Sequence, residues 1–180
     1  MANSRNYSSI VPQYSIRRIA ENMNRTVDDT IQRVITLLQY IGEQCIKIAR
    51  ERGDYNDRTG NLRSSIGYVV LLNGTVVKEK TVEPTNVTPG ERDVVRTRTN
   101  GTQYVAKEKI GGTGREGRKA GKSLLKTLKS KYPRGCVLII CAGMNYAAYV
   151  ENIHGKRVLV DAQLTAERLA FKLFRQNKKQ

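Results

Sequence analysis

The run Gly121–Ser123 reads Gly-Lys-Ser, which is how a nucleotide-binding phosphate loop ends. In such a loop the backbone N–H groups hold the phosphates, and a first glycine stands five residues before the second. Here that position is Glu116, an acid that would repel phosphate, and the nearest glycine, Gly117, is one residue out of place. The spacing argues against nucleotide binding, and we interpret residues 111–122 as a flexible basic loop that leads into a helix.

The single histidine, His154, lies close in sequence to Glu151 and Asp161, side chains that metal and acid–base sites use. A zinc site needs further ligands, and the chain has no second histidine. The composition also allows a nucleophilic pair of His154 with Cys136 or Cys141, but both cysteines lie in an apolar run, where thiols stay protonated and inert. We expect these cysteines to pack in the core, and we predict no catalytic residue, no metal site and no cofactor.

Two carboxylates, Asp54 and Asp57, flank Tyr55 and Asn56. Carboxylates at such a spacing can bind calcium or magnesium, but the rest of an EF-hand loop is missing. We interpret this segment as a solvated turn.

Basic residues crowd into the middle third of a chain whose formal net charge is +16. They are Arg92, Arg96, Arg98, Lys107, Lys109, Arg115, Arg118, Lys119 and Lys122, with Tyr104 among them. Such residues neutralise nucleic-acid phosphates without reading base sequence, whereas a basic arm that faces an acidic partner is an equal alternative. No base-reading motif is visible, so both interpretations stay open. The candidate contacts with nucleic acid or a partner are Arg96, Arg98, Arg115, Arg118, Lys119 and Lys122.

The length of 180 residues suits one hydrophobic core, since domains cluster at about 100–200 residues. Three cysteines without Cys-x-x-Cys spacing predict neither a disulfide framework nor a zinc site, and they fit a reducing intracellular setting. Residues 1–13 lack the pattern of a secretory signal. No stretch approaches the roughly 18 apolar residues of a membrane span, so we expect no membrane contact.

An amphipathic helix is predicted over residues 26–52, because apolar residues recur there at steps of three or four. Thr26 followed by Asp29 resembles a capping box at its start. Residues 14–23 predict a shorter helix that packs back on the long one, or an arm. Residues 1–24 are therefore expected to form an N-terminal arm or short helix.

Further along the chain, β-branched runs predict strands, and the pairs Asn73-Gly74 and Asn100-Gly101 predict turns. The expected elements are strands at Ser65–Leu72 and Thr75–Val82, an extended hairpin or loop between Pro84 and Gly114, a helix at Lys122–Lys131, a central strand at Cys136–Ala142, a helical turn at Tyr146–Glu151, a strand at Arg157–Val160 and a closing helix from Asp161 to about Gln176. This order predicts an α+β fold, in which a long N-terminal amphipathic helix and a C-terminal helix pack on a mainly antiparallel sheet. Residues 25–180 then form one domain with an extended basic insertion at about 84–132.

Two short blocks carry a resemblance to a known family. The first is Arg58-Thr59-Gly60-Asn61-Leu62-Arg63-Ser64-Ser65-Ile66, and the second is Tyr146-Ala147-Ala148-Tyr149-Val150-Glu151. The first block follows a long amphipathic helix and opens a strand. In this order the two blocks resemble those of the tail-completion or head–tail joining family, which are neck proteins of tailed bacteriophages. The resemblance covers about half of the chain and leaves out the basic stretch from Pro84 to Tyr132.

The resemblance implies a structural virion protein that forms a ring in the neck and joins the head to the tail. It implies a homo-oligomer of six or twelve copies that contacts portal or adaptor proteins and tail proteins, made in the cytoplasm of the bacterial host. The basic arm would then contact neighbouring subunits or the genomic DNA. The alternative is a nucleic-acid-binding protein without sequence specificity that uses the basic glycine-rich segment 92–131.

The two blocks also have a structural interpretation. Gly60 permits a sharp turn, Leu62 anchors the start of the strand, and Arg63 is free to pair with Glu151 within the subunit or across an interface. The residues expected to hold the assembly fold are Thr59, Gly60, Leu62, Arg63, Ser65, Tyr146, Ala147, Tyr149 and Glu151.

Overall fold

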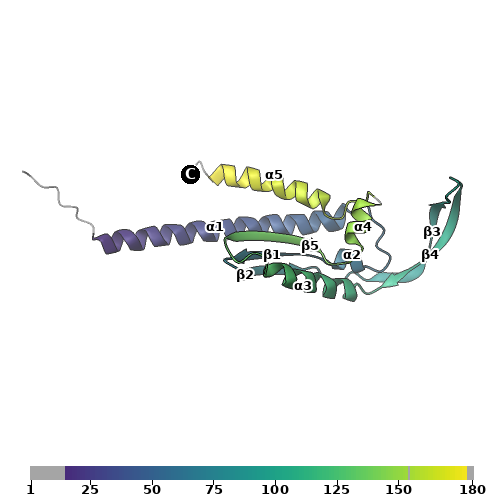
Figure 1. Cartoon of the computed structure of the whole chain (residues 1–180), viewed down its shortest axis with the longest axis horizontal. Coiled ribbons are helices and arrows are strands. Elements are labelled where there is room, and N and C mark those ends of the chain that lie inside the picture. Colours follow the sequence, from purple (N-terminus) through teal and green to yellow (C-terminus); the bar gives the residue numbers. More distant parts are fainter. Residues whose placement is uncertain (1–14, 154, 178–180) are drawn as a thin grey trace, which may run out of the picture. The chain divides into compact units, whose positions relative to one another are not determined.

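The computed structural model describes residues 15–153 and 155–177 (Figure 1). Its elements are α1 Ile16–Glu51, α2 Asn61–Ser64, β1 Ile66–Leu72, β2 Thr75–Thr81, β3 Val87–Thr97, β4 Gln103–Gly112, α3 Arg115–Lys129, β5 Cys136–Ala142, α4 Ala147–Asn152 and α5 Val160–Asn177. The predicted α+β class is confirmed, because the long N-terminal helix and the C-terminal helix pack together on antiparallel strands. The chain divides into two compact units, one ending at Val34 and the other beginning at Ile35. None of the described helices is long and apolar enough to cross a membrane.

Helix α1 begins ten residues before the predicted start at Thr26, at Ile16, and takes in most of the segment predicted as a separate short helix. The Thr26 hydroxyl donates to the carbonyl oxygen of Asn22 at 3.0 Å, a bond typical of a helix interior. The predicted capping box at Thr26 is therefore wrong, because the helix continues through it. Residues 1–14, in which part of the predicted arm falls, lie outside the described residues.

In the first unit, residues 16–34 of α1 form a largely exposed helical segment. Its exposed large apolar side chains are spaced by three or four residues and are Ile16, Ile19, Met23 and Val27. This spacing places them along one face of the helix, so the segment carries an apolar stripe.

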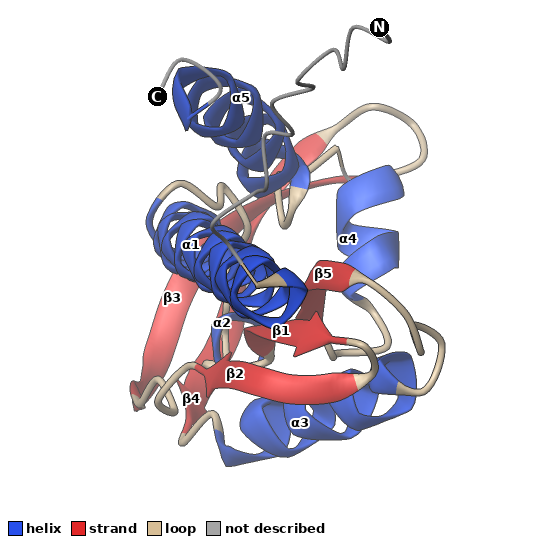
Figure 2. Cartoon of the chain, turned by 90° about the vertical axis from the view of Figure 1, so that its left-hand side faces the viewer, coloured by secondary structure: helices blue, strands red, loops and turns tan. Residues whose placement is uncertain are grey.

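In the second unit, three antiparallel strands lie in the order β2-β1-β5, with β1 at the centre (Figure 2). Residues 35–51 of α1 cover one face of this sheet together with α5, and Tyr68 of β1 packs there with Ile41. Helix α3 covers the other face, where Val69 of β1 packs with Leu125. Strand β1 is therefore buried on both sides.

The apolar run Cys136–Ala142 forms β5 at an edge of the sheet, so its prediction as the central strand is wrong. The run is continuously apolar because both of its faces are covered: Ile139 packs on the α3 side and Leu138 on the α1 side. Burial on both faces does not require a strand to have two neighbours. In the described part of the chain, β5 pairs with β1 alone.

The two Asn-Gly pairs form different turns. Asn73 and Gly74 have φ values of 48° and 78°, and Leu72 pairs with Thr75, as predicted for a two-residue type I′ turn. At the second pair, the N–H of Gly101 donates to the carbonyl of Arg98 at 2.9 Å, and Gly101 alone has a positive φ, of 83°. This is a three-residue turn that ends in a left-handed glycine.

The hairpin predicted between Pro84 and Gly114 is confirmed as β3 and β4, which form a separate two-stranded sheet. We call residues 87–112 the arm. It extends away from the three-stranded sheet (Figure 1). Each strand of the arm pairs only with the other within the described residues, so both outer edges lack a neighbouring strand.

Helix α3 starts at Arg115, so residues 115–122 of the stretch predicted as a loop are helical, while residues 111–112 end β4. A Cβ added at Gly121 would overlap the carbonyl oxygen of Ser65 and lie 3.0 Å from its carbonyl carbon. A Cβ at Gly117 would lie 2.6 Å from the carbonyl carbon of Asn61. The two glycines thus allow the backbone of α3 to approach α2 and β1 more closely than any larger residue would permit.

The strand predicted at Arg157–Val160 is wrong, because residues 157–159 form an irregular link and Val160 begins α5. The backbone N–H of Arg157 donates to Asp54 Oδ1 at 2.6 Å, and Val158 is buried. The link is held by side-chain bonds to its backbone rather than by strand pairing. The closing helix is confirmed as α5.

Candidate functional site

The first block folds into a tight turn and helix α2, whose start is capped by Asp57. The Asp57 carboxylate accepts the N–H groups of Leu62 at 3.3 Å and of Arg63 at 2.8 Å, donors that the first turn of a helix leaves free. The turn predicted at Gly60 is confirmed, with φ at +75°, and an added Cβ there would overlap the backbone of Thr85. Asp57 therefore serves as a helix cap, where the sequence predicts a solvated turn.

The hydroxyl groups of two serines in this block form hydrogen bonds with backbone groups. Ser64 Oγ donates to the carbonyl of Gly60 at 2.6 Å and accepts the N–H of Thr85 at 2.8 Å. Ser65 Oγ donates to the carbonyl of Leu62 at 2.7 Å. Both serines are fully buried, so their hydroxyls satisfy backbone groups that water does not reach.

The second block forms α4 and packs against the first. Ala147 is buried in a cluster with Leu62 and Val158, since a small residue lets two backbones come close. Tyr146 and Tyr149 are exposed, in contrast. The structure therefore brings together two blocks that lie about 80 residues apart in the sequence.

Arg63 and Glu151 do not form the predicted ion pair within the subunit, and in the described structure each has another partner. Glu151 Oε1 accepts the N–H groups of Leu159 at 2.8 Å and Val160 at 2.9 Å, and so caps the start of α5. The Arg63 guanidinium lies over the ring of Tyr55, 5.5 Å from its centroid, within cation–π range. A pair across an interface stays a prediction.

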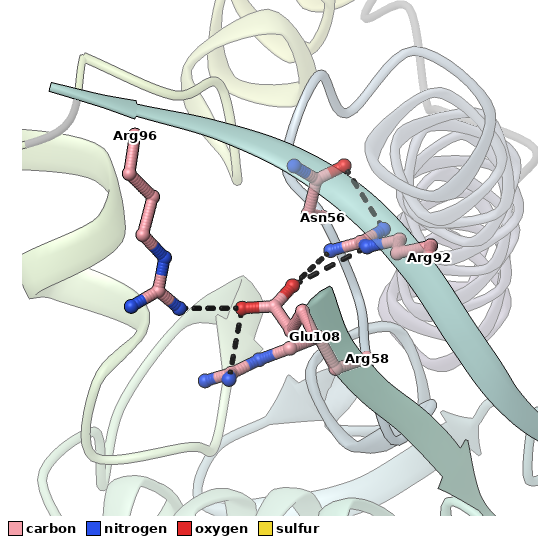
Figure 3. Close-up of polar contacts among 5 residues, drawn as sticks. All are labelled: Asn56, Arg58, Arg92, Arg96 and Glu108. Atoms are coloured by element: carbon pink, nitrogen blue, oxygen red, sulfur yellow. Dashed lines mark hydrogen bonds and ion pairs between the residues drawn. The ribbon is translucent and has the colours of Figure 1, made fainter. Parts of the chain in front are cut away.

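Three arginines converge on the carboxylate of Glu108 (Figure 3). Arg92 Nη2 donates to Oε2 at 2.8 Å, while Arg58 Nη1 and Arg96 Nη2 donate to Oε1 at 3.1 and 3.2 Å. Arg92 also donates to the side-chain oxygen of Asn56 at 3.4 Å. The hydrogen bond from Arg92, together with the charges around it, holds the pKa of Glu108 below its ordinary value. The cluster ties the arm to the first block, because Arg58 belongs to that block and the other two arginines to β3.

The cluster lies in the wall of a cavity of about 980 Å³, which we call the arginine cavity. It is lined by Tyr55, Asn56, Asp57, Arg58, Thr59, Asn61, Leu62, Arg92, Val94, Val95, Arg96, Glu108, Lys109, Glu116, Met144, Tyr146, Val150 and Lys156. Both blocks and the middle of the arm therefore contribute to one site. Its walls combine guanidinium groups with apolar side chains, a composition that protein–protein interfaces share.

The remaining basic candidates divide into paired and unpaired residues. Arg118 pairs with Glu83 at 2.9 Å, and Arg98 lies over the ring of Tyr104 at 5.0 Å. On the outer side of α3, the exposed basic residues without a charged partner in the described chain are Arg115, Lys119, Lys122 and Lys126. Their spacing of four, three and four residues places them on one face of the helix. We call this set the α3 stripe.

Sequence reasoning missed Glu108, the residue at the centre of the cluster, and Lys126. Glu108 stands directly opposite Arg92 on the neighbouring strand, but a two-residue turn at Asn100-Gly101 would have placed Lys109 there instead. Lys126 lies four residues after Lys122 within the predicted helix Lys122–Lys131, so helical spacing could have found it. The extension of the α3 stripe to Arg115 and Lys119 could not be found, because those residues were predicted as a loop.

The residues considered for chemistry have structural roles where they are described. Burial raises the pKa of Cys45 to about 11 and that of Cys141 to about 12, and it also raises the pKa of Cys136. Cys141 packs in the core as predicted. His154 lies outside the described residues. Among those that are described, no group of three or more histidine, cysteine, aspartate or glutamate side chains is arranged to hold a metal ion.

Comparison of the chain with known protein families, with curated proteins and with solved structures finds no match.

Proposed function

We propose that this chain is a structural subunit of the neck of a tailed bacteriophage, where a ring of copies joins the head to the tail. The observation that carries the proposal is the arm. Its two strands pair only with each other in the described structure, and a two-stranded hairpin by itself is marginally stable in water. A neighbouring molecule that covers the arm would stabilise it, and a closed assembly supplies such a neighbour.

Two further surfaces support an assembly role. The outer edge of β5 belongs to an uncharged strand without Pro or Gly, and such an edge is suited to strand addition. The apolar stripe on residues 16–27 of α1 is exposed, as in helices that pack on another molecule.

In this proposal the copies contact one another head to tail, and the ring closes when the rotation between neighbours allows it. Six or twelve copies are expected from the symmetry of such necks. One side of the ring contacts the portal or adaptor, and the other contacts tail proteins. The protein would act in the virion, without catalysis and without a cofactor.

A shortened arm tests the proposal. Replacing residues 92–108 by a short glycine-serine turn should leave the three-stranded sheet folded but prevent ring formation, so that particles carry heads without tails. Mass photometry of the purified chain and electron microscopy of particles measure these outcomes. The control is Lys47→Ala on the exposed surface of α1, which should assemble normally. A full-length chain that stays monomeric at high concentration, is absent from virions and is dispensable for head–tail joining contradicts the proposal.

A second function, binding of nucleic acid without sequence specificity, is favoured by the α3 stripe. Four unpaired cationic side chains in a row on an exposed helix face can neutralise successive backbone phosphates. In a neck this surface would face the DNA, but DNA binding would also be a sufficient function by itself.

Salt dependence tests this second function. Changing all four residues of the α3 stripe to glutamine should reduce the magnitude of the slope of log affinity for duplex DNA against log salt by about 3.6, because each lost phosphate contact contributes about 0.9 to the slope. The matched control removes four charges from the arginine cavity, at Arg58, Arg96, Lys109 and Lys156. Equal losses of slope in the two variants would show that net charge, and not the α3 stripe, determines binding.

A further inference from the structure

We propose that the arginine cavity is a docking site for an acidic segment of a neighbouring protein, a segment that places a carboxylate next to an apolar side chain. The inference rests on the proposed assembly function and names the chemistry of one partner. It assigns a role to a cavity that the resemblance to neck proteins does not explain.

The cluster has an unbalanced charge. Three guanidinium groups share the single carboxylate of Glu108, which leaves two positive charges uncompensated. The Arg58 and Arg96 side chains are 55 and 52% exposed, so N–H donors remain accessible from the cavity. Guanidinium groups bind carboxylates in a planar, bidentate arrangement. Glu108 already holds the three guanidinium groups in place for a carboxylate ligand.

Part of the cavity wall is apolar. Met144, Val150 and Val94 line the same cavity as the arginines and are only partly buried. An ion or a solvated carboxylate alone would leave this wall in contact with water. A peptide segment with an apolar side chain beside its acidic one would bury the wall and satisfy the arginines at the same time.

The net charge of the chain favours a different protein as the source of the carboxylates. The chain has 32 lysine and arginine residues against 16 aspartate and glutamate residues, so a second copy brings repulsion at long range. A different protein with a negative surface is the better electrostatic complement.

Asp57, Glu108 and Glu116 also line the cavity and disfavour closely spaced negative charges, phosphates and carboxylates alike. The apolar wall favours a peptide over nucleic acid, because a phosphate backbone has no apolar side chain to cover it. A nucleic acid finds a better surface on the α3 stripe, where no acid interrupts the row of cations.

The test uses the full chain and a fluorescein-labelled peptide of alternating glutamate and leucine. The cavity variant Arg58→Gln/Arg96→Gln should raise the Kd roughly ten-fold or more, because each lost charge-assisted bond weakens binding. The matched control Lys119→Gln/Lys122→Gln removes the same charge from the α3 stripe and should change the Kd less than about two-fold. Thermal melts verify that both variants are folded. If the cavity variant does not fold, Lys109→Gln/Lys156→Gln takes its place.

Any of four other outcomes contradicts the inference. The unmodified chain fails to bind the acidic peptide, or it binds a glutamine-leucine peptide equally well. The control variant weakens binding as much as the cavity variant does, or a thymidine oligonucleotide displaces the peptide at a similar concentration. Loss of self-association in the cavity variant would assign the cavity to a second copy instead. The neck proposal is judged separately by particle assembly, so a chain that enters particles but does not bind the peptide removes the docking inference and leaves the neck proposal intact.

Discussion

Replacing Gly121 by alanine is expected to lower the free energy of unfolding by about 2–3 kcal/mol, although alanine is the better helix former by roughly 1 kcal/mol. The reason is the close approach of α3 to β1. The new Cβ would overlap the carbonyl oxygen of Ser65, which belongs to the backbone and cannot rotate away. Moving the helix outward would separate Leu125 from the sheet core, where it is fully buried.

Thermal unfolding measures this effect, and for a chain of this length a loss of 2–3 kcal/mol corresponds to a fall in Tm of about 5–10 °C. Gly90→Ala is the matched control, because a Cβ there would meet a single neighbouring atom, Ile110 Cγ1, at 4.0 Å. That variant should shift Tm by no more than about 2 °C. A Gly121→Ala chain as stable as the Gly90→Ala chain would show that α3 does not depend on close backbone contact.

The same contact explains why the start of α3 was not predictable. Residues 111–122 contain five glycines, and each glycine inside a helix costs about 1 kcal/mol relative to alanine. Local propensity therefore favours a loop. The compensation comes from contacts of Gly117 and Gly121 with residues about 55 positions earlier in the chain, and a local pattern contains no information about them.

Elements whose stabilising contacts are local or periodic were predictable. The β1–β2 hairpin follows from Asn73-Gly74, whose two positive φ values require those residue types. Helices α1 and α5 follow from apolar periodicity, although the start of α1 does not, because Thr26 and Asp29 resemble a cap even where the helix continues through them.

The arginine cavity was not predictable because it depends on hairpin register. A two-residue turn at Asn100-Gly101 would place residues 99 and 102 opposite each other, whereas in the structure Thr97 pairs with Gln103. A shift of one residue exchanges the two faces of β4, so different side chains of β4 then share a face of the hairpin with the arginines of β3. The three-residue turn puts Glu108 opposite Arg92, and the cluster follows from that pairing.

Replacing Glu108 by glutamine is expected to lower the free energy of unfolding by about 1–2 kcal/mol. Removing one partner of a fully buried ion pair typically costs about 3–5 kcal/mol, but Arg58 and Arg96 are half exposed and solvent screens their charges, so the smaller figure applies. The amide still accepts hydrogen bonds but no longer offsets three guanidinium charges. Glu91→Gln is the matched control, since Glu91 is exposed and lies on the same arm.

The stability difference between the unmodified chain and Glu108→Gln depends on pH, and this dependence separates the effect of the charge from that of packing. The pKa of Glu108 is lowered in the folded chain by its arginine partners, so its stabilising contribution is complete above the ordinary glutamate pKa of about 4.3 and is lost as the pH falls through the lowered value. Urea unfolding adds no ions and so does not screen the charges. It should show the largest gap in the free energy of unfolding between the unmodified chain and Glu108→Gln above about pH 5. The gap should narrow toward lower pH, because protonation then removes the same charge from the unmodified chain. A gap that stays constant down to low pH would mean that Glu108 acts through its shape, and the charge argument for the arginine cavity would fail with it.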